Sequence, residues 1–283
     1  MLSYRHQFHA GNPADVLKHT VQSLILEALK QKEKTIFYLD THAGAGCYAL
    51  NHPYSQKTAE YRTGIARLWG RSDIPPSLKP YLQAINAVNG SDQLRHYPGS
   101  PAIAATLLRP HDQLYFSERH PTDFSALQHR FKGDRRVYVS ATDGYQQLSA
   151  RLPPPSRRGV IFIDPAYELK SDYQAVVTAL QRGYRRFPTG VYALWYPVVQ
   201  RWRTEQLFQA LRCCGLAPIL HIELALQAAC EAPGMTASGM LVLNPPWKLE
   251  GQVAELLPWL QRILCQPGEG YGSLQWLTTS GSG

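Results

Sequence analysis

The stretch GVIFIDPAYE, residues 159–168, decides the fold class of this 283-residue chain. A run of apolar residues ends in Asp164, and Pro165, Ala166 and Tyr167 follow directly. A short continuous apolar run that ends in a break is typical of a strand buried on both faces, as in a parallel sheet. A carboxylate at the tip of such a strand lies where ligands bind in doubly wound sheets. This stretch therefore predicts both a central strand and a functional site at its end.

Strand-like and helix-like segments alternate on both sides of this stretch. The expected strands are residues 35–40, 113–118, 136–140, 160–164, 190–198, 220–226 and 240–244. The expected helices are a first helix from Pro13 and then residues 99–108, 122–131, 143–152, 171–186, 203–214 and 251–264. Such alternation predicts an α/β fold with a mostly parallel sheet covered on both faces.

The first helix has a clear start signal. Asn12 is a favourable N-cap residue, and Pro13 fits the first helical position. Asp15 falls in the first turn, where a carboxylate interacts favourably with the positive end of the helix dipole. We therefore expect the helix to begin at Pro13.

Residues 50–98 interrupt the alternation with many prolines and aromatic residues. Two helices are expected there, TAEYRTGIARLWG (58–70) and PSLKPYLQAINAV (76–88). We interpret 50–98 as a small helical subdomain inserted after the first strand. The main domain would then consist of residues 1–49 and 99–283.

The charge of the chain favours a nucleic-acid partner. The formal net charge is +8, and only 18% of residues are charged, whereas 44% are hydrophobic. Arginine pairs at 135–136, 157–158 and 185–186 provide forked donors that match phosphate oxygens. The alternative is a basic surface that serves only solubility.

The cysteines and the termini indicate a cytoplasmic protein. The five cysteines include no C-x-x-C pair, which favours reduced thiols over disulfides or a zinc site. His6 and His9 have no matching acid or cysteine spacing, so no metal is expected. Neither an apolar signal region nor a membrane-length apolar run is present, so no membrane partner is expected. The tail TTSGSG (278–283) is interpreted as a disordered end or a remnant of cloning.

A glycine-rich turn follows the first expected strand. Asp40 ends that strand, and THAGAG (41–46) comes next. Glycines such as Gly44 allow the backbone to approach a ligand closely. The turn lacks the short βαβ setting of a dinucleotide-binding fingerprint, because the next strand begins only at residue 113.

Acids follow the next strands at the same edge of the sheet. Glu118 ends the second strand and is placed to accept hydrogen bonds from two ribose hydroxyls. Asp143 and Gly144 follow the third strand, where the acid can accept from an adenine amino group or cap the next helix. With Asp164 after the fourth strand, the series indicates a nucleoside-containing cofactor. S-adenosylmethionine fits better than NAD because the pyrophosphate fingerprint lacks its setting.

The residues DPAY at 164–167 suit the methylation of an exocyclic amine. The nitrogen lone pair of adenine is delocalised into the ring, so a catalyst must localise it. The carboxylate of Asp164 and the carbonyl of Pro165 can each accept one N–H, and Tyr167 can stack on an extruded base. The alternative is a strand end, a proline turn and a packing tyrosine. Both a proton-accepting and a purely positioning role of Asp164 stay open.

The motif resembles the [DNS]-P-P-[YFW] sequence of adenine-N6 methyltransferases, with Ala166 in place of the second proline. A second stretch, NPPW (244–247), fits those letters better. It follows the last expected strand, which in a methyltransferase fold is antiparallel and points away from the cofactor. We therefore interpret Asn244–Trp247 as a turn with a packing tryptophan. Trp195 and Tyr196 either shape a base pocket or pack in the interior.

Six stretches together resemble the RlmJ family, bacterial adenine-N6 methyltransferases of 23S ribosomal RNA. They are MLSYRHQFHAGNPADVLKH, YLDTHAGAG, YPGSP, IDPAYE, YALWYPV and GMTASGM. The resemblance covers nearly the whole chain and implies a Rossmann-like methyltransferase fold, S-adenosylmethionine as donor and protein-free or early-assembly rRNA as substrate. We also expect a monomer, although the sequence itself is silent on oligomeric state.

The resemblance implies roles for individual residues. The cofactor contacts it implies are Lys18, His19, His42, Ser100, Glu118, Asp143 and Gly144, beside Gly44 of the glycine turn and Asp164. Asp164 would be the catalytic acceptor and Tyr4 would contact the substrate RNA. His19 and His42 have the alternative of ordinary hydrogen-bonded histidines, and Tyr4 of a frayed terminal residue.

Two other functions are compatible with parts of the sequence. A DNA adenine-N6 methyltransferase would share the motif, but residues 50–98 are few for a domain that reads duplex grooves. A catalytically inert RNA-binding assembly factor is supported by Ala166 alone.

Overall fold

The computed structural model describes residues 5–90, 93–227 and 234–279. Tyr4, the expected RNA contact, lies outside these ranges. The strands are β1 (Phe37–Asp40), β2 (Cys47–Ala49), β3 (His96–Pro98), β4 (Gln113–Ser117), β5 (Val137–Ser140), β6 (Gly159–Ile163), β7 (Val191–Val198), β8 (Ile219–Ala225), β9 (Ala237–Leu243) and β10 (Tyr271–Thr278). The helices are α1 (Pro13–Lys30), α2 (Pro53–Thr58), α3 (Lys79–Asn89), α4 (Ser100–Leu107), α5 (Pro121–Arg130), α6 (Gly144–Arg151), α7 (Lys170–Arg186), α8 (Arg201–Cys213) and α9 (Leu249–Leu264).

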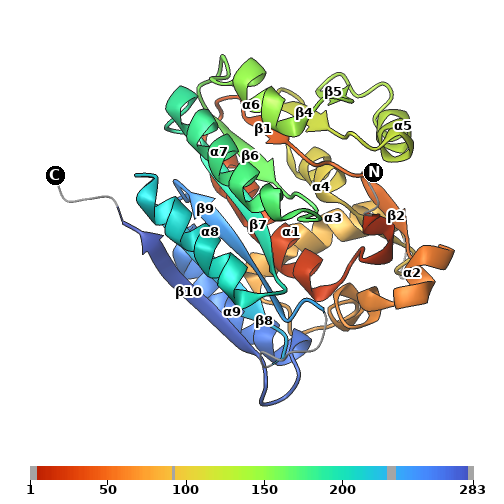
Figure 1. Ribbon diagram of the computed structural model, residues 1–283. Coiled ribbons are helices and arrows are strands. Elements are labelled where there is room, and N and C mark those ends of the chain that lie inside the picture. The colour runs from red at the N-terminus through yellow and green to blue at the C-terminus, as the bar shows by residue number, and fades with distance from the viewer. Residues whose placement is uncertain (1–4, 91–92, 228–233, 280–283) are drawn as a thin grey trace.

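An eight-stranded sheet with the order β10-β8-β9-β7-β6-β1-β4-β5 forms the centre of the molecule (Figure 1). The strands β7, β6, β1, β4 and β5 are parallel to their neighbours within this group. Strand β9 is antiparallel to both β7 and β8, and β10 is antiparallel to β8. This confirms the predicted α/β fold, because the order β5-β4-β1-β6-β7 is that of a doubly wound, Rossmann-like sheet.

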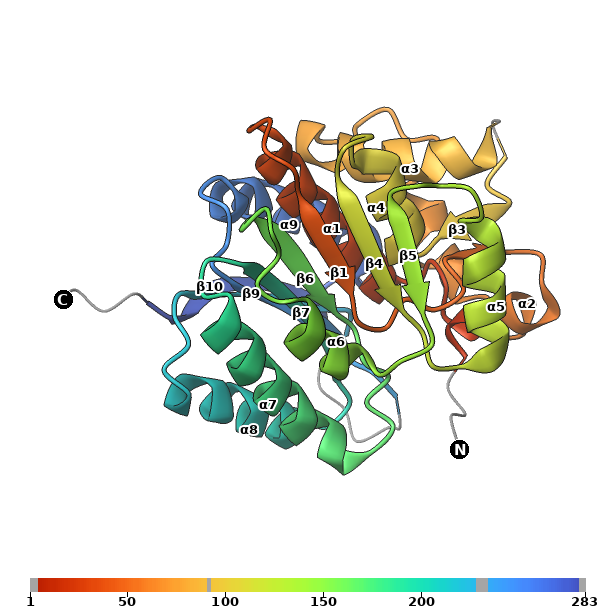
Figure 2. The same ribbon diagram turned by 90° about the horizontal axis from the view of Figure 1, so that it is seen from above.

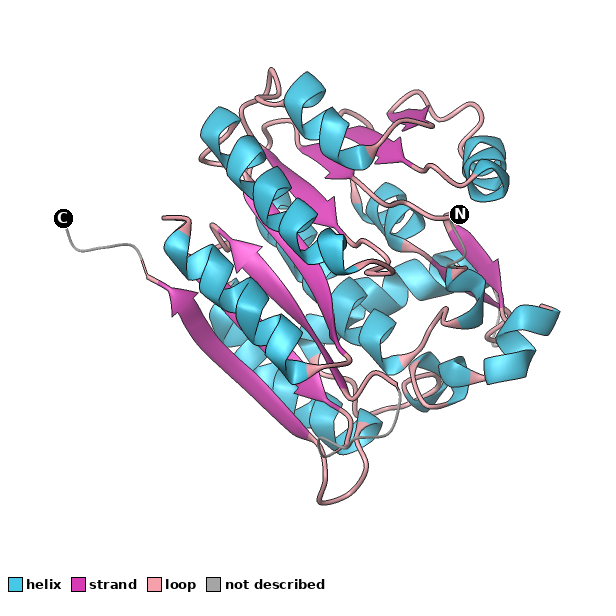
Figure 3. Cartoon of the chain, viewed as in Figure 1, coloured by secondary structure: helices cyan, strands magenta, loops and turns pink. Residues whose placement is uncertain are grey.

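Helices cover both faces of the sheet, as Figure 2 and Figure 3 show. The period-2 alternation of each strand divides the apolar side chains between two cores. Tyr38 of β1 and Phe162 of β6 belong to the core under α1, α4 and α9. Leu39 and Ile163 belong to the core under α6, α7 and α8. The uninterrupted apolar run of β6 is explained by this burial on both faces.

The ends of β1 and β6 meet at the point where the strand order reverses. Asp40 of β1 is in register with Phe162 of β6, and the chain runs from β1 outward to β4 and β5 before it returns to β6. The loops that follow β1 and β6 therefore lie beside each other. This is the position at which doubly wound sheets bind ligands.

The segment between β2 and β3 packs on the main core. Strands β2 and β3 pair with each other, and Tyr81 and Ile85 of α3 are fully buried in the same core as α1. The prediction of an α-helix over 58–70 is wrong, because only 3₁₀ turns form there, at Glu60–Arg62 and Ile65–Arg67. Helix α2 ends at Thr58, and its C-cap residue Ala59 has a left-handed φ of 52°. The division of the chain into residues 1–49 with 99–283 and an inserted subdomain stays a prediction.

The tight approach of one backbone to another explains the break at Gly64. A Cβ atom on Gly64 would lie 2.1 Å from the carbonyl oxygen of Gly11. The amide of Ile65 donates to that same carbonyl oxygen. Gly64 therefore allows the insertion to pack closely against Gly11, just before α1. The chain does not continue as an α-helix at this point.

The turn after β9 corrects one prediction about NPPW. Strand β9 is antiparallel, as expected, and the Asn244 side chain donates to the carbonyl oxygens of Pro188 and Gly190 at 2.7 and 2.8 Å. Trp247, however, is 90% exposed, so its prediction as a packing tryptophan is wrong. Asn244 has a left-handed φ of 50° in this turn.

The C-terminal edge strand β10 was not predicted. It includes Thr278, whose hydroxyl donates to the carbonyl oxygen of Leu216, so the interpretation of 278–283 as a disordered end is wrong at its first residue. Residues 280–283 lie outside the described ranges. None of the helices in the described part of the chain has the length and apolar character needed to span a membrane. The cysteines at 47, 213, 214 and 265 are free thiols, and Cys230 lies outside the described residues.

Candidate active site

A cavity of about 390 Å³ opens at the carboxyl edge of the parallel strands. Its walls come from α1 and from the loops that follow β1, β4, β5 and β6. The structure brings all the predicted cofactor residues to this one cavity: Lys18, His19, His42, Gly44, Ser100, Glu118, Asp143, Gly144 and Asp164. Pro165 and Ala166 also line it, whereas Tyr167 does not.

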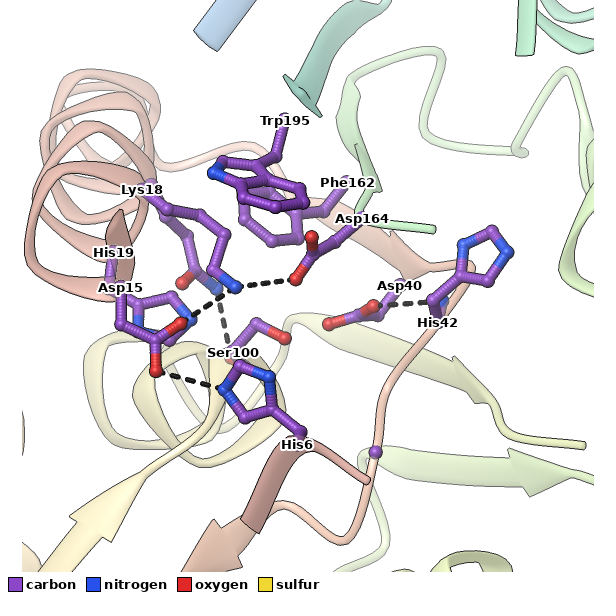
Figure 4. A network of polar contacts seen from close by, with 12 residues as sticks. His6, Asp15, Lys18, His19, Asp40, His42, Ser100, Phe162, Asp164 and Trp195 are labelled. Carbon is purple, nitrogen blue, oxygen red and sulfur yellow. Dashed lines mark hydrogen bonds and ion pairs between the residues drawn. The ribbon is translucent and has the colours of Figure 1, made fainter. Parts of the chain in front are cut away.

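A buried chain of charges connects α1 to the tip of β6 (Figure 4). The Lys18 ammonium lies 2.6 Å from Asp164 Oδ2 and 2.8 Å from Asp15 Oδ1. Lys18 and Asp15 are almost fully buried, and Asp164 is partly buried. The second oxygen of Asp15 lies 2.9 Å from His6 Nε2. Lys18 thus holds the carboxylate of Asp164 from one side.

The environment of this chain stabilises its charges. Burial alone raises the pKa of Asp15, but the interactions with His6 and Lys18 outweigh it and hold that pKa well below its usual range. Burial lowers the pKa of Lys18, but Asp15 and Asp164 outweigh it and raise that pKa. The prediction that Asn12 caps α1 is confirmed, since its side chain accepts from the Asp15 amide. Asp15 lies in the first turn of α1, and its carboxylate also belongs to the ion-pair chain.

Asp40, at the tip of β1, is a second buried carboxyl group. It accepts from the Tyr38 hydroxyl and from the His42 amide, each at 3.2 Å. Burial raises the pKa of Asp40 to about 7, and the negative charge of Asp164 acts in the same direction, whereas the Ser100 hydroxyl lowers the pKa. Asp40 therefore fixes the start of the glycine turn beneath the cavity floor.

The glycine turn is held by the acid that follows β4. Glu118 accepts from the amides of Gly44 at 2.7 Å and His120 at 2.6 Å. Burial raises the pKa of Glu118 above its usual value, although these two amides act in the opposite direction. Gly44 has a left-handed φ of 61°, which favours glycine. The prediction that Glu118 lies at the ligand edge fits its place in the cavity wall.

Asp143 and Gly144 bring α6 close to β1. One oxygen of Asp143 accepts from the Tyr145 amide, so its interpretation as a helix cap is confirmed, and the other lies 3.4 Å from Arg119. A Cβ atom on Gly144 would lie 2.0 Å from the Thr41 carbonyl oxygen. Only glycine fits at this close approach.

His19 is buried and His42 is partly buried, and burial lowers the pKa of both. His19 Nδ1 lies 2.7 Å from the Tyr97 hydroxyl, and burial lowers the pKa of His19 well below its usual value. His42 Nδ1 lies 2.8 Å from the Thr41 hydroxyl, and burial lowers the pKa of His42 to about 4. Both are hydrogen-bonded histidines, the alternative that the sequence left open, and both line the cavity.

The loop after β6 has a constrained backbone. Tyr167 has a left-handed φ of 52°, and its hydroxyl donates to the Trp195 carbonyl oxygen at 2.9 Å. Its ring centroid lies 4.6 Å from that of Tyr173. Tyr167 therefore packs behind the loop, and its stacking on a base stays a prediction. The Trp195 ring lies under the Lys18 ammonium at 5.3 Å.

Sequence reasoning missed several residues of the cavity wall. Ser117 and Tyr145 line it, and their buried hydroxyls have no hydrogen-bond partner among the described residues. His6 also lines it. Ser117 precedes the recognised Glu118 and Tyr145 follows Gly144, so the strand-end rule could have found both.

Comparisons with known proteins agree on one family. The family model described as "Ribosomal RNA large subunit methyltransferase D, RlmJ" matches residues 33–278. Ribosomal RNA large subunit methyltransferase J of Escherichia coli is 54% identical over 277 residues, which cover 98% of this chain and 99% of that protein. The protein of the same name from Haemophilus influenzae is 52% identical over 279 residues, with the same two coverages.

A solved structure supports the same fold. A crystal structure of a protein from Legionella pneumophila superposes with a TM-score of 0.89 at 38% sequence identity. The superposition covers 95% of this chain and 98% of that one. The fold of this chain, including the insertion between β2 and β3, is thus shared along nearly its whole length.

Proposed function

The chain belongs to the RlmJ family of ribosomal RNA large subunit methyltransferases, and on that premise we propose that it methylates the N6 amino group of an adenosine in 23S rRNA with S-adenosylmethionine as donor. The observation that carries this proposal is the carboxylate of Asp164. It lies at the tip of a central parallel strand, in the wall of the cavity, with Lys18 fixed 2.6 Å away.

The cavity fits a nucleoside-containing donor. A volume of about 390 Å³ lies within the usual range for small-molecule sites. The unpartnered buried hydroxyls of Ser117 and Tyr145 need hydrogen-bond partners that a ribose or an adenine ring provides. We assign the ribose to Glu118 and the adenine amino group to Asp143, at whose oxygens a donor on the ligand competes with Arg119.

When bound, S-adenosylmethionine supplies an electrophilic methyl group on a positively charged sulfur. The chain must then present the amine of the substrate adenosine with its lone pair directed at that carbon. Oδ2 of Asp164 takes the ion pair with Lys18, and we assign one amine N–H to Oδ1. The carbonyl of Pro165, whose φ the ring fixes, accepts the second N–H. Two such acceptors orient the nitrogen, and positioning of this kind is a large part of catalysis.

Lys18 contributes by holding the acceptor in place. It is anchored by Asp15, and Asp15 by His6, so the Asp164 side chain has a fixed partner on the interior side. The Lys18 charge also offsets the negative charge that a lone carboxylate would bring next to Asp40. Ala166 is exposed at the rim of the cavity, where the missing proline affects the stiffness of the loop more than its chemistry.

We further propose that the enzyme acts in the cytoplasm, as a monomer, on rRNA free of ribosomal proteins. A base must leave its stack to reach a cavity of this depth, and bound proteins restrict that motion. The net charge of +8 supports a polyanionic substrate.

The test is labelled methyl transfer from S-adenosylmethionine to three substrates in parallel. We expect transfer to stripped 23S rRNA, with N6-methyladenosine as the only labelled nucleoside. Much less label should be transferred to intact large subunits or to duplex DNA. Preferred labelling of duplex DNA would favour a DNA methyltransferase. RNA binding without transfer to any substrate would favour an inert assembly factor.

A further inference from the structure

A second groove, of about 220 Å³, lies between α7 and α8. Its walls include Lys170 and Tyr173 of α7, and Trp202, Arg203 and Gln206 of α8. Within the described residues no acidic side chain lines it, although the adjoining catalytic cavity has several.

The groove adjoins the catalytic cavity. Helix α7 follows β6 and α8 follows β7, and because these strands are parallel neighbours both helices begin at the catalytic edge. Figure 1 shows the two helices side by side, and they pack against each other. At the start of α7, the N-cap residue Leu169 and Asp172 line the cavity, whereas Lys170 and Tyr173 line the groove. Adjacent residues of the same turn thus line the two sites.

The start of α8 carries two arginines, one that forms an ion pair and one that forms none among the described residues. Arg201 makes two hydrogen bonds of 2.8 Å to the buried Glu223, so it anchors the helix. Arg203 makes no ion pair among the described residues, and its buried Nε has no hydrogen-bond partner there. Its guanidinium lies 5.2 Å from the ring centroid of Trp202. Arg203 therefore keeps donors for an anion that enters the groove.

The groove also presents an aromatic surface. The Trp202 side chain is 54% exposed, and Leu169 and Val199 at the same edge are also exposed. Large apolar side chains at a catalytic edge are typical of surfaces that a substrate covers. Aromatic rings beside unpaired cations are the combination by which proteins hold single-stranded nucleic acid.

We propose that this groove binds the nucleotide next to the target adenosine in the substrate RNA. The base stacks on Trp202, and its phosphate pairs with Arg203 and Lys170. The inference rests on the proposed function and deepens it, since a base turned into the cavity leaves its neighbours unstacked within reach of the rim. The positive charge of the lining favours RNA over a partner protein as the occupant.

The test measures the KM for stripped rRNA at several salt concentrations. Arg203→Ala should raise KM and lower the steepness of log KM against log salt by about 0.7, the contribution of one phosphate contact on a single strand. Trp202→Ala should raise KM by about fivefold or more without changing that steepness. In both variants kcat and the affinity for S-adenosylhomocysteine should stay within about twofold of the wild type, since only uniform binding is lost.

Conservative variants and a matched control guard against trivial effects. Arg203→Lys should restore the salt dependence, and Trp202→Phe should recover most of the affinity. Arg212→Ala removes the same charge from the exposed C-terminal part of α8, outside the groove, and should leave KM unchanged.

Three outcomes would overturn the inference. The first is an unchanged KM and salt dependence in Arg203→Ala and Trp202→Ala. The second is an equal loss in Arg212→Ala. The third is a defect seen only with partly assembled subunits, which would assign the groove to a protein. If the wild type transfers no methyl group, the proposed function fails instead, and the direct affinity for an rRNA fragment, compared between wild type and variants, then decides on the groove alone.

Discussion

The Lys18→Met substitution tests whether the buried ion-pair chain holds the site together. Lys18 is 3% exposed and contacts two carboxylates, so its removal leaves the buried Asp15 without its cationic neighbour and Asp164 without its anchor. Loss of one partner from a buried ion pair costs about 3–5 kcal/mol of unfolding free energy. For a chain of this size such a loss lowers Tm by about 10 °C.

A matched control lies on the same helix. Lys30 pairs with Glu27 at 2.6 Å, but both side chains are much more exposed, at 25% and 31%. Lys30→Met should therefore change the unfolding free energy by less than about 0.5 kcal/mol. Urea unfolding followed by circular dichroism measures both variants against the wild type.

The loss in Lys18→Met should depend on pH. In the wild type the pKa of Asp15 lies well below its usual range, so Asp15 stabilises the fold above its unfolded pKa and loses this effect as pH falls through the folded pKa. Without Lys18 burial acts with less opposition, the Asp15 pKa rises, and protonation relieves the buried charge at mildly acidic pH. The difference from wild type should thus be smaller at pH 5 than at pH 7. A loss equal to that of Lys30→Met, at either pH, would refute the reasoning.

Three further predictions test other parts of the structure by the same unfolding assay. Gly144→Ala places a Cβ 2.0 Å from the Thr41 carbonyl oxygen, so it should lower the free energy of unfolding by about 1–3 kcal/mol and weaken cofactor binding. The control Gly251→Ala, in open space on α9, should leave stability unchanged or raise it. Equal effects of the two substitutions would contradict the close approach at Gly144. Because the pKa of Asp40 is raised to about 7, the folded state binds one more proton than the unfolded state between the unfolded pKa and pH 7. The free energy of unfolding should therefore fall by up to about 4 kcal/mol as pH rises through that window. Asp40→Asn should remove this pH dependence, and a variant that keeps it would point to another group. Trp247→Ser should change stability by less than about 0.5 kcal/mol because the side chain is 90% exposed, and a loss of several kcal/mol would restore the packing interpretation.

The parts of the fold that could be predicted from the sequence are those with strong local patterns. The apolar run before Asp164 predicted β6, since a strand buried on both faces needs an uninterrupted apolar sequence. Strand β10 was not predicted because its sequence, YGSLQWLT (271–278), mixes polar and apolar residues. An edge strand such as β10, which pairs only with β8 among the described strands, tolerates such a mixture. The 58–70 segment has helical spacing, but its glycine serves a contact with Gly11 that no local pattern reveals.

The candidate site shows the same division between local and distant information. The acids at the strand ends were predictable, because the carboxyl ends of parallel strands meet at one edge. The pairing of Lys18 with Asp164 joins residues 146 positions apart, and only the packing of α1 on the sheet brings them together. Asp15 illustrates the limit, since its place in the first turn of a helix says nothing about a buried ion pair. The exposure of Trp247 depends on which way the Asn244 turn directs the chain, and the letters NPPW do not specify that direction.

The most direct test of the central claim compares single-turnover methyl transfer to stripped 23S rRNA by Asp164→Ala and Asn244→Ala. Asp164 lies in the cavity wall, whereas the Asn244 side chain is committed to the carbonyl oxygens of Pro188 and Gly190. We predict that Asp164→Ala lowers the transfer rate by about 10²-fold or more while it still binds S-adenosylhomocysteine, and that Asn244→Ala keeps the wild-type rate. A wild-type rate in Asp164→Ala together with a lost rate in Asn244→Ala would contradict the account.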